Sequence, residues 1–300
     1  MNETPERRSN ALTESASATA QIHDISFAGY DGERTSVARV PLVLAWWSVL
    51  RAFGRRRGWV AKFVPFALLG FAFMPAVGVL TVRGLFAKQL DEIQLPVEML
   101  PYSAYLGIIA TMIVLWTALV TPELVCPDIQ HRVTTLYFAT AVSPSRYVFG
   151  KWLASFGALL SMTLLQVLLL WIGNIMFAPS VTDALRTDLD QLPRIVGAAV
   201  IVAVFFSTLG LAIAAMTGRR AYAIGALVGL ILGSGVLSGV VISTGNTDLG
   251  AAVNLVGAPI QLAQRLFDDN GISVGAHVLS YLIIVGLSAF ALLNRFRSRS

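Results

Sequence analysis

The chain has 300 residues, of which 56% are hydrophobic and only 13% are charged. A water-soluble domain of this length carries about twice that fraction of charged residues, so composition excludes a soluble globular protein. Long apolar runs indicate an all-α polytopic membrane protein instead. The net charge of +5 does not predict a nucleic-acid partner, because the basic residues lie beside apolar runs, where they set topology. Cys126 is the only cysteine, which excludes an internal disulfide and a cysteine-rich metal site.

The first 39 residues are predicted to form a largely disordered cytoplasmic segment. Residues 1–21 are rich in Ser, Thr, Ala, Glu and Arg, and they bury too little apolar surface to fold alone. A short island at 22–32 ends in the turn signal Asp31-Gly32. This long polar start does not resemble a cleavable signal peptide.

Residues 40–59 are predicted to form an amphipathic helix in the membrane interface. Their apolar residues recur at helical spacing, and three arginines follow them directly. An apolar, aromatic helix with a basic end suits an interfacial position; the alternative is that this segment begins the first span. The residues that indicate the interface are Trp46, Trp47, Arg55, Arg56 and Arg57.

Residues 60–294 are predicted to form a domain of six transmembrane helices, followed by a basic cytoplasmic tail at 295–300. Each apolar run reaches or nearly reaches the roughly 20 residues that a bilayer requires. The predicted spans are Phe63–Val82, Ala104–Val120, Tyr147–Phe177, Ile195–Met216, Tyr222–Ser243 and Ala276–Leu293. The second span is expected to continue as a helix beyond the membrane towards Glu123.

The distribution of charge between the spans predicts the orientation. Basic residues follow the even-numbered spans, precede the first and are concentrated at 55–62, 131–151, 219–220 and 295–299. The opposite loops carry Asp91, Glu92, Glu98, Asp183, Asp188, Asp190, Asp248, Asp268 and Asp269. Because Lys and Arg are enriched in cytoplasmic loops, both termini are predicted to lie in the cytoplasm.

The interiors of the spans contain almost no ionisable residues, unlike those of ion-coupled carriers and proton pumps. Gln166 and Asn174 in the third span are the strongest polar groups there and are candidates for a translocation path. His277, near the outer end of the sixth span, is interpreted as an interfacial or hydrogen-bonded residue. No catalytic, cofactor-binding or metal-binding constellation is found, so an intramembrane enzyme is disfavoured.

Two further segments predict close packing within the membrane. Gly225, Gly229 and Gly233 recur every four residues in the fifth span, which permits close helix approach. The spacing favours packing within one subunit and leaves open a mobile interface. The outer loop 249–267 is largely apolar yet too short to cross and return, so we expect a re-entrant segment; an apolar loop over the outer mouth is the alternative.

The loop between the second and third spans, Pro122–Lys151, is the most informative segment. Its apolar residues Ile129, Val133, Leu136 and Tyr137 fall on one face of a helix. Asp128 follows Pro127 and is predicted to start that helix by capping free amides. Ser143-Pro144 is predicted to end it. The product would be a short cytoplasmic helix between two spans.

These residues also carry a resemblance. Asp128-x-x-x-Arg132-x-Thr134-x-Leu136, then Ser143-Pro144-Ser145-Arg146, then Gly150-Lys151, resemble the cytoplasmic loop of ABC-2 type transporter permeases. The stretch from Asn254-Leu255 through Pro259 to Arg265 resembles the segment before the last span of that family. The island Ile22-His23-Asp24 with Tyr30-Asp31-Gly32 and Arg34 is similar to the N-terminal segment of an actinobacterial-type branch. Val133 departs from the family, which often has a small residue before its threonine.

The resemblance implies an interfacial helix, six spans, a coupling helix and a re-entrant outer segment. It implies a multi-pass protein of the bacterial inner membrane that acts with a second permease subunit and a separate ABC ATPase. ATP and Mg would be bound by that partner, since this chain lacks Gly-x-x-x-x-Gly-Lys-Ser/Thr. The implied coupling residues are Asp128, Ile129, Arg132, Val133, Leu136, Tyr137 and Arg146.

The substrate is open at this point. Uncharged span interiors favour export of a lipidic, amphipathic or drug-like molecule. The alternatives are a permease for a polysaccharide or peptide, and a non-transporting membrane sensor or anchor.

Overall fold

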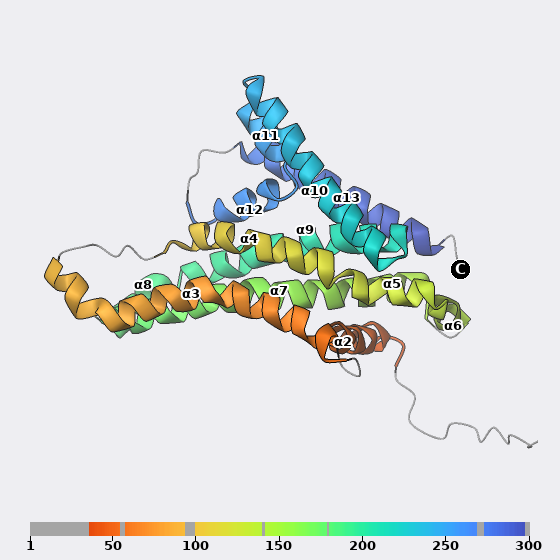
Figure 1. Ribbon diagram of the computed structural model, residues 1–300, viewed down its shortest axis with the longest axis horizontal. Helices are drawn as coiled ribbons and strands as arrows, with labels where there is room; N and C mark the ends of the chain where they lie inside the picture. The colour runs from red at the N-terminus through yellow and green to blue at the C-terminus, as the bar shows by residue number, and fades with distance from the viewer. Residues whose placement is uncertain are drawn as a thin grey trace, which may run out of the picture. The chain divides into compact units, whose positions relative to one another are not determined.

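The computed structural model describes residues 36–54, 58–93, 100–139, 142–178, 180–268 and 273–297, and every element in these ranges is an α-helix (Figure 1). Within them, six helical segments are long and apolar enough to cross a membrane. The chain is therefore an all-helical, multi-pass membrane protein. The helix labels are those of Figure 1.

The six predicted spans are confirmed as six long apolar helical segments; most ends differ by a few residues, but helix α3 continues to Ile93 and the second segment to Gln130. The long helices are α3 (Trp59–Ile93), α4 (Tyr102–Leu119), α7 (Pro144–Met176), α9 (Gln191–Thr217), α10 (Arg220–Ser243) and α13 (Val274–Arg297). The second apolar segment runs from Tyr102 to Gln130, because α4 is followed almost directly by α5 (Pro122–Gln130). This extension past Glu123 agrees with the sequence analysis.

Shorter helices connect and flank the long ones. They are α2 (Val40–Ala52), α6 (Val133–Ala139), α8 (Val181–Asp188), α11 (Thr247–Val253) and α12 (Gly257–Gln264). Helix α2 ends earlier than the predicted residue 59, because Gly54 adopts a left-handed backbone with φ 76°. The predicted interfacial residues Arg55, Arg56 and Arg57 lie outside the described residues.

Helix α9 forms the centre of the bundle. In its most apolar window 72% of residues are buried, against 11% in α10 and 17% in α13. Figure 1 shows α3, α4, α7 and α9 running side by side, with α10 and α11 projecting away from them. Gly210 allows α4 to approach α9, since a Cβ there would lie 2.6 Å from Thr117 Cγ2. The Tyr105 hydroxyl fastens α4 to α3 by donating to the Ala72 carbonyl at 2.8 Å.

The glycine spacing in α10 does not serve packing within the described chain. A Cβ built at Gly225, Gly229 or Gly233 would have no heavy atom within 4 Å apart from the adjacent residues and the nearby backbone of its own helix. The expectation of intrasubunit packing is therefore wrong for these positions. These three glycines are exposed, and the surface that they form faces away from the rest of the described chain.

The single helix predicted from Asp128 to Ser143 is also wrong. Asp128 lies near the end of α5, and the chain turns at His131 and Arg132 before α6 begins. Arg132 has φ 54°, the left-handed conformation that commonly terminates helices. Asp128 does not cap a helix start, because its carboxylate is bound to side chains of α2 and α7.

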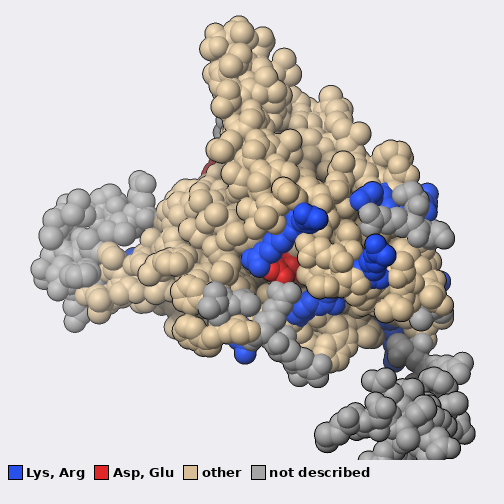
Figure 2. Space-filling view, turned by 45° about the vertical axis from the view of Figure 1, so that its right-hand side comes forward, with Lys and Arg blue, Asp and Glu red and all other residues tan. Residues whose placement is uncertain are grey.

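We call one end of the helix bundle the basic end. It is formed by α2, α5, α6, the start of α7, the junction of α9 with α10 and the end of α13 (Figure 1). Figure 2 shows Lys and Arg side chains gathered on the face that includes this end. The opposite end carries α8, α11 and α12. Here α11 and α12 form the segment predicted to be re-entrant, as two short helices joined at Asn254.

Candidate functional site

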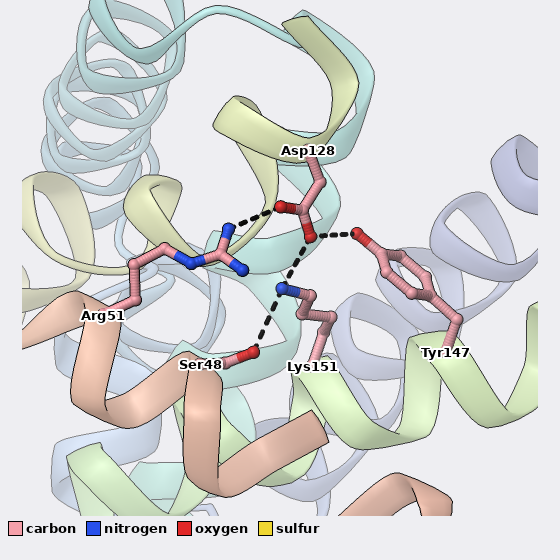
Figure 3. Close-up of polar contacts among 5 residues, drawn as sticks. All are labelled: Ser48, Arg51, Asp128, Tyr147 and Lys151. Atoms are coloured by element: carbon pink, nitrogen blue, oxygen red, sulfur yellow. Dashed lines mark hydrogen bonds and ion pairs between the residues drawn. The ribbon is translucent and has the colours of Figure 1, made fainter. Parts of the chain in front are cut away.

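Five side chains from three helices meet at the basic end, around the carboxylate of Asp128 (Figure 3). Ser48 and Arg51 come from α2, Asp128 comes from α5, and Tyr147 and Lys151 come from α7. We call these residues the Asp128 cluster. They join segments that are far apart in the sequence, since Arg51 and Asp128 are separated by 77 positions.

The carboxylate of Asp128 is fully engaged. Its Oδ1 lies 2.5 Å from Arg51 Nη1, and its Oδ2 lies 2.7 Å from Lys151 Nζ. The hydroxyl of Tyr147 donates to Oδ2 at 3.0 Å, and Lys151 Nζ donates to the Ser48 hydroxyl at 3.0 Å. Each charged group of the cluster therefore has a hydrogen-bonded partner, as burial demands.

The cluster is buried where charge is costly. The Asp128 and Lys151 side chains are each 2% exposed, and the Arg51 side chain is 31% exposed. Burial lowers the pKa of the Arg51 guanidinium, but the hydrogen bond to Asp128 and the charge of that carboxylate offset this effect, so the pKa lies above its ordinary value. Arg51 therefore stays charged throughout the physiological pH range.

Local sequence explains how the three helices come together. Ser48 and Arg51 are one turn apart on α2, and Tyr147 and Lys151 are one turn apart on α7, so each pair projects from one helix face. Gly150 lies between Tyr147 and Lys151 on α7 and permits α2 to cross close to α7. A Cβ at Gly150 would lie 3.0 Å from Leu44 Cδ2 and from the Pro41 carbonyl oxygen, both on α2. Two adjacent residues of α7 thus hold the assembly together: Gly150 allows the close contact with α2, and Lys151 forms the ion pair with Asp128 of α5.

A second ion pair ties α5 to α10. Glu123 Oε1 contacts Arg220 Nη1; the carboxylate is nearly buried, whereas the arginine is 47% exposed. With the Asp128 cluster, this pair connects α5 to α2, α7 and α10. A displacement of α5 would therefore act on three other helices.

Helix α6 lies against this assembly on one side and is open on the other. The rings of Tyr137 and Phe138 pack on Tyr147, with centroids 5.6 Å and 5.9 Å away. Phe296 of α13 packs on the same tyrosine at 5.1 Å. On the outer side of α6, Leu136 is 69% exposed. Helix α6 thus combines an anchored aromatic face with an exposed apolar residue.

The structure brings together some of the predicted coupling residues and separates others. Asp128 and Tyr137 meet around Tyr147. Ile129 and Val133 are half-buried, whereas Arg132, Leu136 and Arg146 are exposed. The expected face of Ile129, Val133, Leu136 and Tyr137 is consequently divided: Tyr137 packs on the chain's own Tyr147, and Leu136 points away from the core.

Sequence reasoning missed the partners of Asp128. The sequence pattern places Tyr147 at the start of the third span and Lys151 at the end of the basic loop, and it assigns neither of them, nor Arg51, as a partner of Asp128. A signal was present, because a carboxylate at the end of one apolar span was followed by a lysine in the first turns of the next. Unlike charges at similar membrane depth are expected to pair.

The remaining predicted residues do not belong to the cluster. Trp46 and Trp47 are exposed on α2. Gln166 and Asn174 are buried inside the bundle. Asn174 accepts a hydrogen bond from Arg83 and donates one to the Tyr102 hydroxyl, whereas the side chain of Gln166 has no hydrogen-bond partner among the described residues. A role of these two residues in translocation stays a prediction.

His277 is hydrogen-bonded, as predicted. Its Nδ1 lies 3.0 Å from the Ser273 carbonyl oxygen, and its Nε2 lies 3.0 Å from Gln261 Oε1 of α12. Among the described residues, no group of three or more His, Cys, Asp or Glu side chains is placed to hold a metal ion. The Asp128 cluster instead connects α2, α5 and α7 through buried ion pairs and hydrogen bonds.

Comparison with models of known protein families and with curated proteins gave no match to this chain. The class defined by the fold is that of a multi-pass helical membrane protein with six candidate spans. Its distinguishing feature is the Asp128 cluster, which joins three helices at the basic end.

Proposed function

We propose that this chain is the permease subunit of an ABC-2 type transporter. In this proposal it works in a bacterial inner membrane with a second permease subunit, and a separate ATPase subunit hydrolyses ATP. The exported molecule would be lipidic, amphipathic or drug-like, because the described spans expose apolar surfaces and contain few charged groups.

The observation that supports the proposal is the arrangement of α5 and α6. Helix α6 presents Leu136 outward, while its aromatic face contacts Tyr147 of the Asp128 cluster. An external protein that binds α6 would therefore act on α7 through Tyr147, on α2 through Arg51 and on α10 through the Glu123–Arg220 pair. Such connections are what a receiving surface for a partner's movement requires.

The proposed mechanism needs no chemistry in this chain. Nucleotide-driven closure of the ATPase dimer would press on α6 and α5, and the long helices would carry the displacement to the opposite end. A partner shifts the permease between states only through contacts that differ between those states. In this mechanism Arg132 and Leu136 contact the ATPase, and Asp128, Tyr147 and Lys151 transmit the displacement within the chain.

The first prediction tests the receiving surface. An ABC ATPase that co-purifies with the chain is first identified, and both co-purification and ATPase stimulation are then measured for each variant. Arg132→Glu reverses an exposed charge and Leu136→Ala removes an exposed apolar contact, so each should reduce ATPase stimulation at least tenfold. The expected loss corresponds to about 1.4 kcal/mol or more, as for a residue that dominates an interface.

Leu249→Ala supplies the matched control. Leu249 is also strongly exposed, but it lies on α11 at the opposite end, so its variant should stimulate the ATPase normally. Normal stimulation by both α6 variants would refute α6 as the receiving surface. Copurification of a kinase or sensor protein, with no ATPase bound, would favour an anchor or sensor instead.

A further inference from the structure

A groove of about 350 Å³ opens between α7 and α13, with α9 at its base. Its α7 residues lie on a different face of that helix from Tyr147 and Lys151 of the Asp128 cluster, and the groove has no part in the mechanism proposed above. Volumes of this size are typical of small-molecule sites. The groove is lined by Ser145, Val148, Phe149, Trp152, Val204, Thr208, Val285, Ala289, Leu292 and Leu293.

The wall of the groove is apolar, and its deeper polar groups already have partners. The Trp152 indole donates to the Thr208 hydroxyl at 2.9 Å, and that hydroxyl donates to the Val204 carbonyl at 2.7 Å. The ring of Trp152 also stacks between Phe149 and Phe156, with centroids 6.1 Å and 5.0 Å away. These contacts hold the indole as a fixed wall, so the groove suits an apolar occupant.

The position of the groove fits one leaflet of a bilayer. Along α7 the lining residues run from Ser145, in the first turn, to Trp152, which is a rise of about 10 Å. This length is roughly a third of the 30 Å hydrocarbon core. The groove therefore begins at the basic end, on the side that the charge distribution predicts to be cytoplasmic, and extends towards the membrane centre.

The basic end supplies positive charge just beyond the lining residues Ser145 of α7 and Leu293 of α13. Arg146 follows Ser145 and is exposed, and Arg297 is exposed in the last turn of α13. The contact of Tyr147 with Phe296 brings these two helix ends together. The first turn of α7 contains no acidic residue that would oppose an anion.

We propose that this groove binds an anionic phospholipid of the leaflet at the basic end. One acyl chain lies against Trp152 and Ala289, and the headgroup phosphate lies beside Arg146 and Arg297. Basic pockets between transmembrane helices on the cytoplasmic side are suited to such headgroups, and each nearby arginine favours an anionic lipid about fivefold. This proposal does not rest on the transport function.

The test uses the indole of Trp152 as a reporter, because bromine atoms on an acyl chain quench a tryptophan that they contact. The full chain and its Trp152→Phe variant are reconstituted in phosphatidylcholine vesicles that contain brominated phosphatidylglycerol or, separately, brominated phosphatidylcholine. The difference between chain and variant gives the quenching of Trp152. We expect brominated phosphatidylglycerol to quench Trp152 at several-fold lower mole fraction than brominated phosphatidylcholine.

Three variants separate the headgroup from the acyl chain. Arg146→Gln with Arg297→Gln should remove most of the preference for phosphatidylglycerol while leaving quenching by either lipid in excess. Ala289→Phe fills the groove and should reduce quenching of Trp152 by both lipids. Arg219→Gln removes an exposed arginine at the start of α10, which does not line the groove, and should leave the preference unchanged.

Two outcomes would overturn the proposal. Equal quenching of Trp152 by the two brominated lipids would mean ordinary contact with the bilayer, without a site for an anionic headgroup. Absence of Trp152 quenching by both lipids would mean that a second copy of the chain, or another protein segment, covers the groove. Arg146→Gln alone serves as the test if the double variant does not insert.

Discussion

Asp128 is the residue on which the packing of the basic end depends. Its carboxylate faces two cations and a tyrosine hydroxyl, and all three of these groups come from helices other than its own. Removal of one member of a buried ion pair is costly because the other charge is left without compensation. Asp128 therefore stabilises the fold mainly by compensating the charge of Lys151, which is nearly inaccessible to water.

This arrangement predicts a large loss of stability for Asp128→Asn. The variant should lose about 3–5 kcal/mol, because water would have to enter the cluster to solvate Lys151. The measurement is the midpoint of thermal unfolding in detergent. Glu123→Gln is the matched control: it also removes a carboxylate of α5, but its partner Arg220 is half exposed, so the loss should be at most about 1 kcal/mol.

The double variant Asp128→Asn with Lys151→Met should recover part of the lost stability, since it removes the uncompensated lysine. Equal unfolding midpoints for Asp128→Asn and Glu123→Gln would contradict this account of the cluster.

At the residue scale, the sequence alone identified Asp128 as notable but assigned it the wrong role. The preceding proline suggested a helix start, because capping is a local property that a short window reveals. The true partners lie on α2 and α7, and local periodicity holds no information on pairings across 77 positions. Leu136 illustrates the same limit: its spacing placed it on an apolar helix face, but not on the side away from the core.

At the element scale, the crossing of α2 over α7 determines whether the cluster can form. The crossing depends on Gly150, where a Cβ would meet Leu44 and the backbone of Pro41 at 3.0 Å. Any larger residue must push α2 outward, since a backbone carbonyl cannot rotate aside. Helix α2 is thus held against α7 by a small residue, Gly150, and by the ion-paired residue that follows it, Lys151.

Gly150→Leu should therefore release α2 from α7. The change is measured by maleimide labelling of a cysteine introduced at Ala45, which is buried on α2. Labelling should be slow in the otherwise unchanged chain, whose own Cys126 is buried, and several-fold faster with Gly150→Leu. Gly157→Leu on the same helix is the control, because a Cβ there meets no atom within 4 Å. Equal labelling rates in the two leucine variants would contradict the role of Gly150.

At the scale of the whole molecule, hydropathy predicts which helices are long enough to cross the membrane, but not which of them lie at the centre of the bundle. Hydropathy located the six apolar helices, and most of their ends to within a few residues, since apolar length is a property of the sequence alone. It could not tell which spans are central: α9 and α10 have similar hydropathy, 2.4 and 2.2, yet very different buried fractions. Only packing reveals that α9 is surrounded and that the glycines of α10 face outward.

The predicted orientation, with the basic end in the cytoplasm, can be tested with reporter proteins fused at the two ends of the bundle. A fluorescent protein that matures only in the cytoplasm should fluoresce when it is fused after Ser300. An alkaline phosphatase that is active only outside the cytoplasm should be active when inserted between Asn246 and Thr247, in the turn after α10. The physical reason is the excess of Lys and Arg at the basic end. An active phosphatase at the C-terminus would reverse the assigned orientation.

The turn at His131 and Arg132 has a consequence for how the loop tolerates changes of length. Successive helix residues are rotated by about 100°, so one residue added to or removed from the turn would rotate the phase of α6 by that angle. Tyr137 would then leave the ring of Tyr147, and Leu136 would no longer occupy the outward position. The left-handed backbone of Arg132 fixes this phase. The number of residues in the turn, more than their chemical identity, thus determines which side of α6 an incoming protein meets.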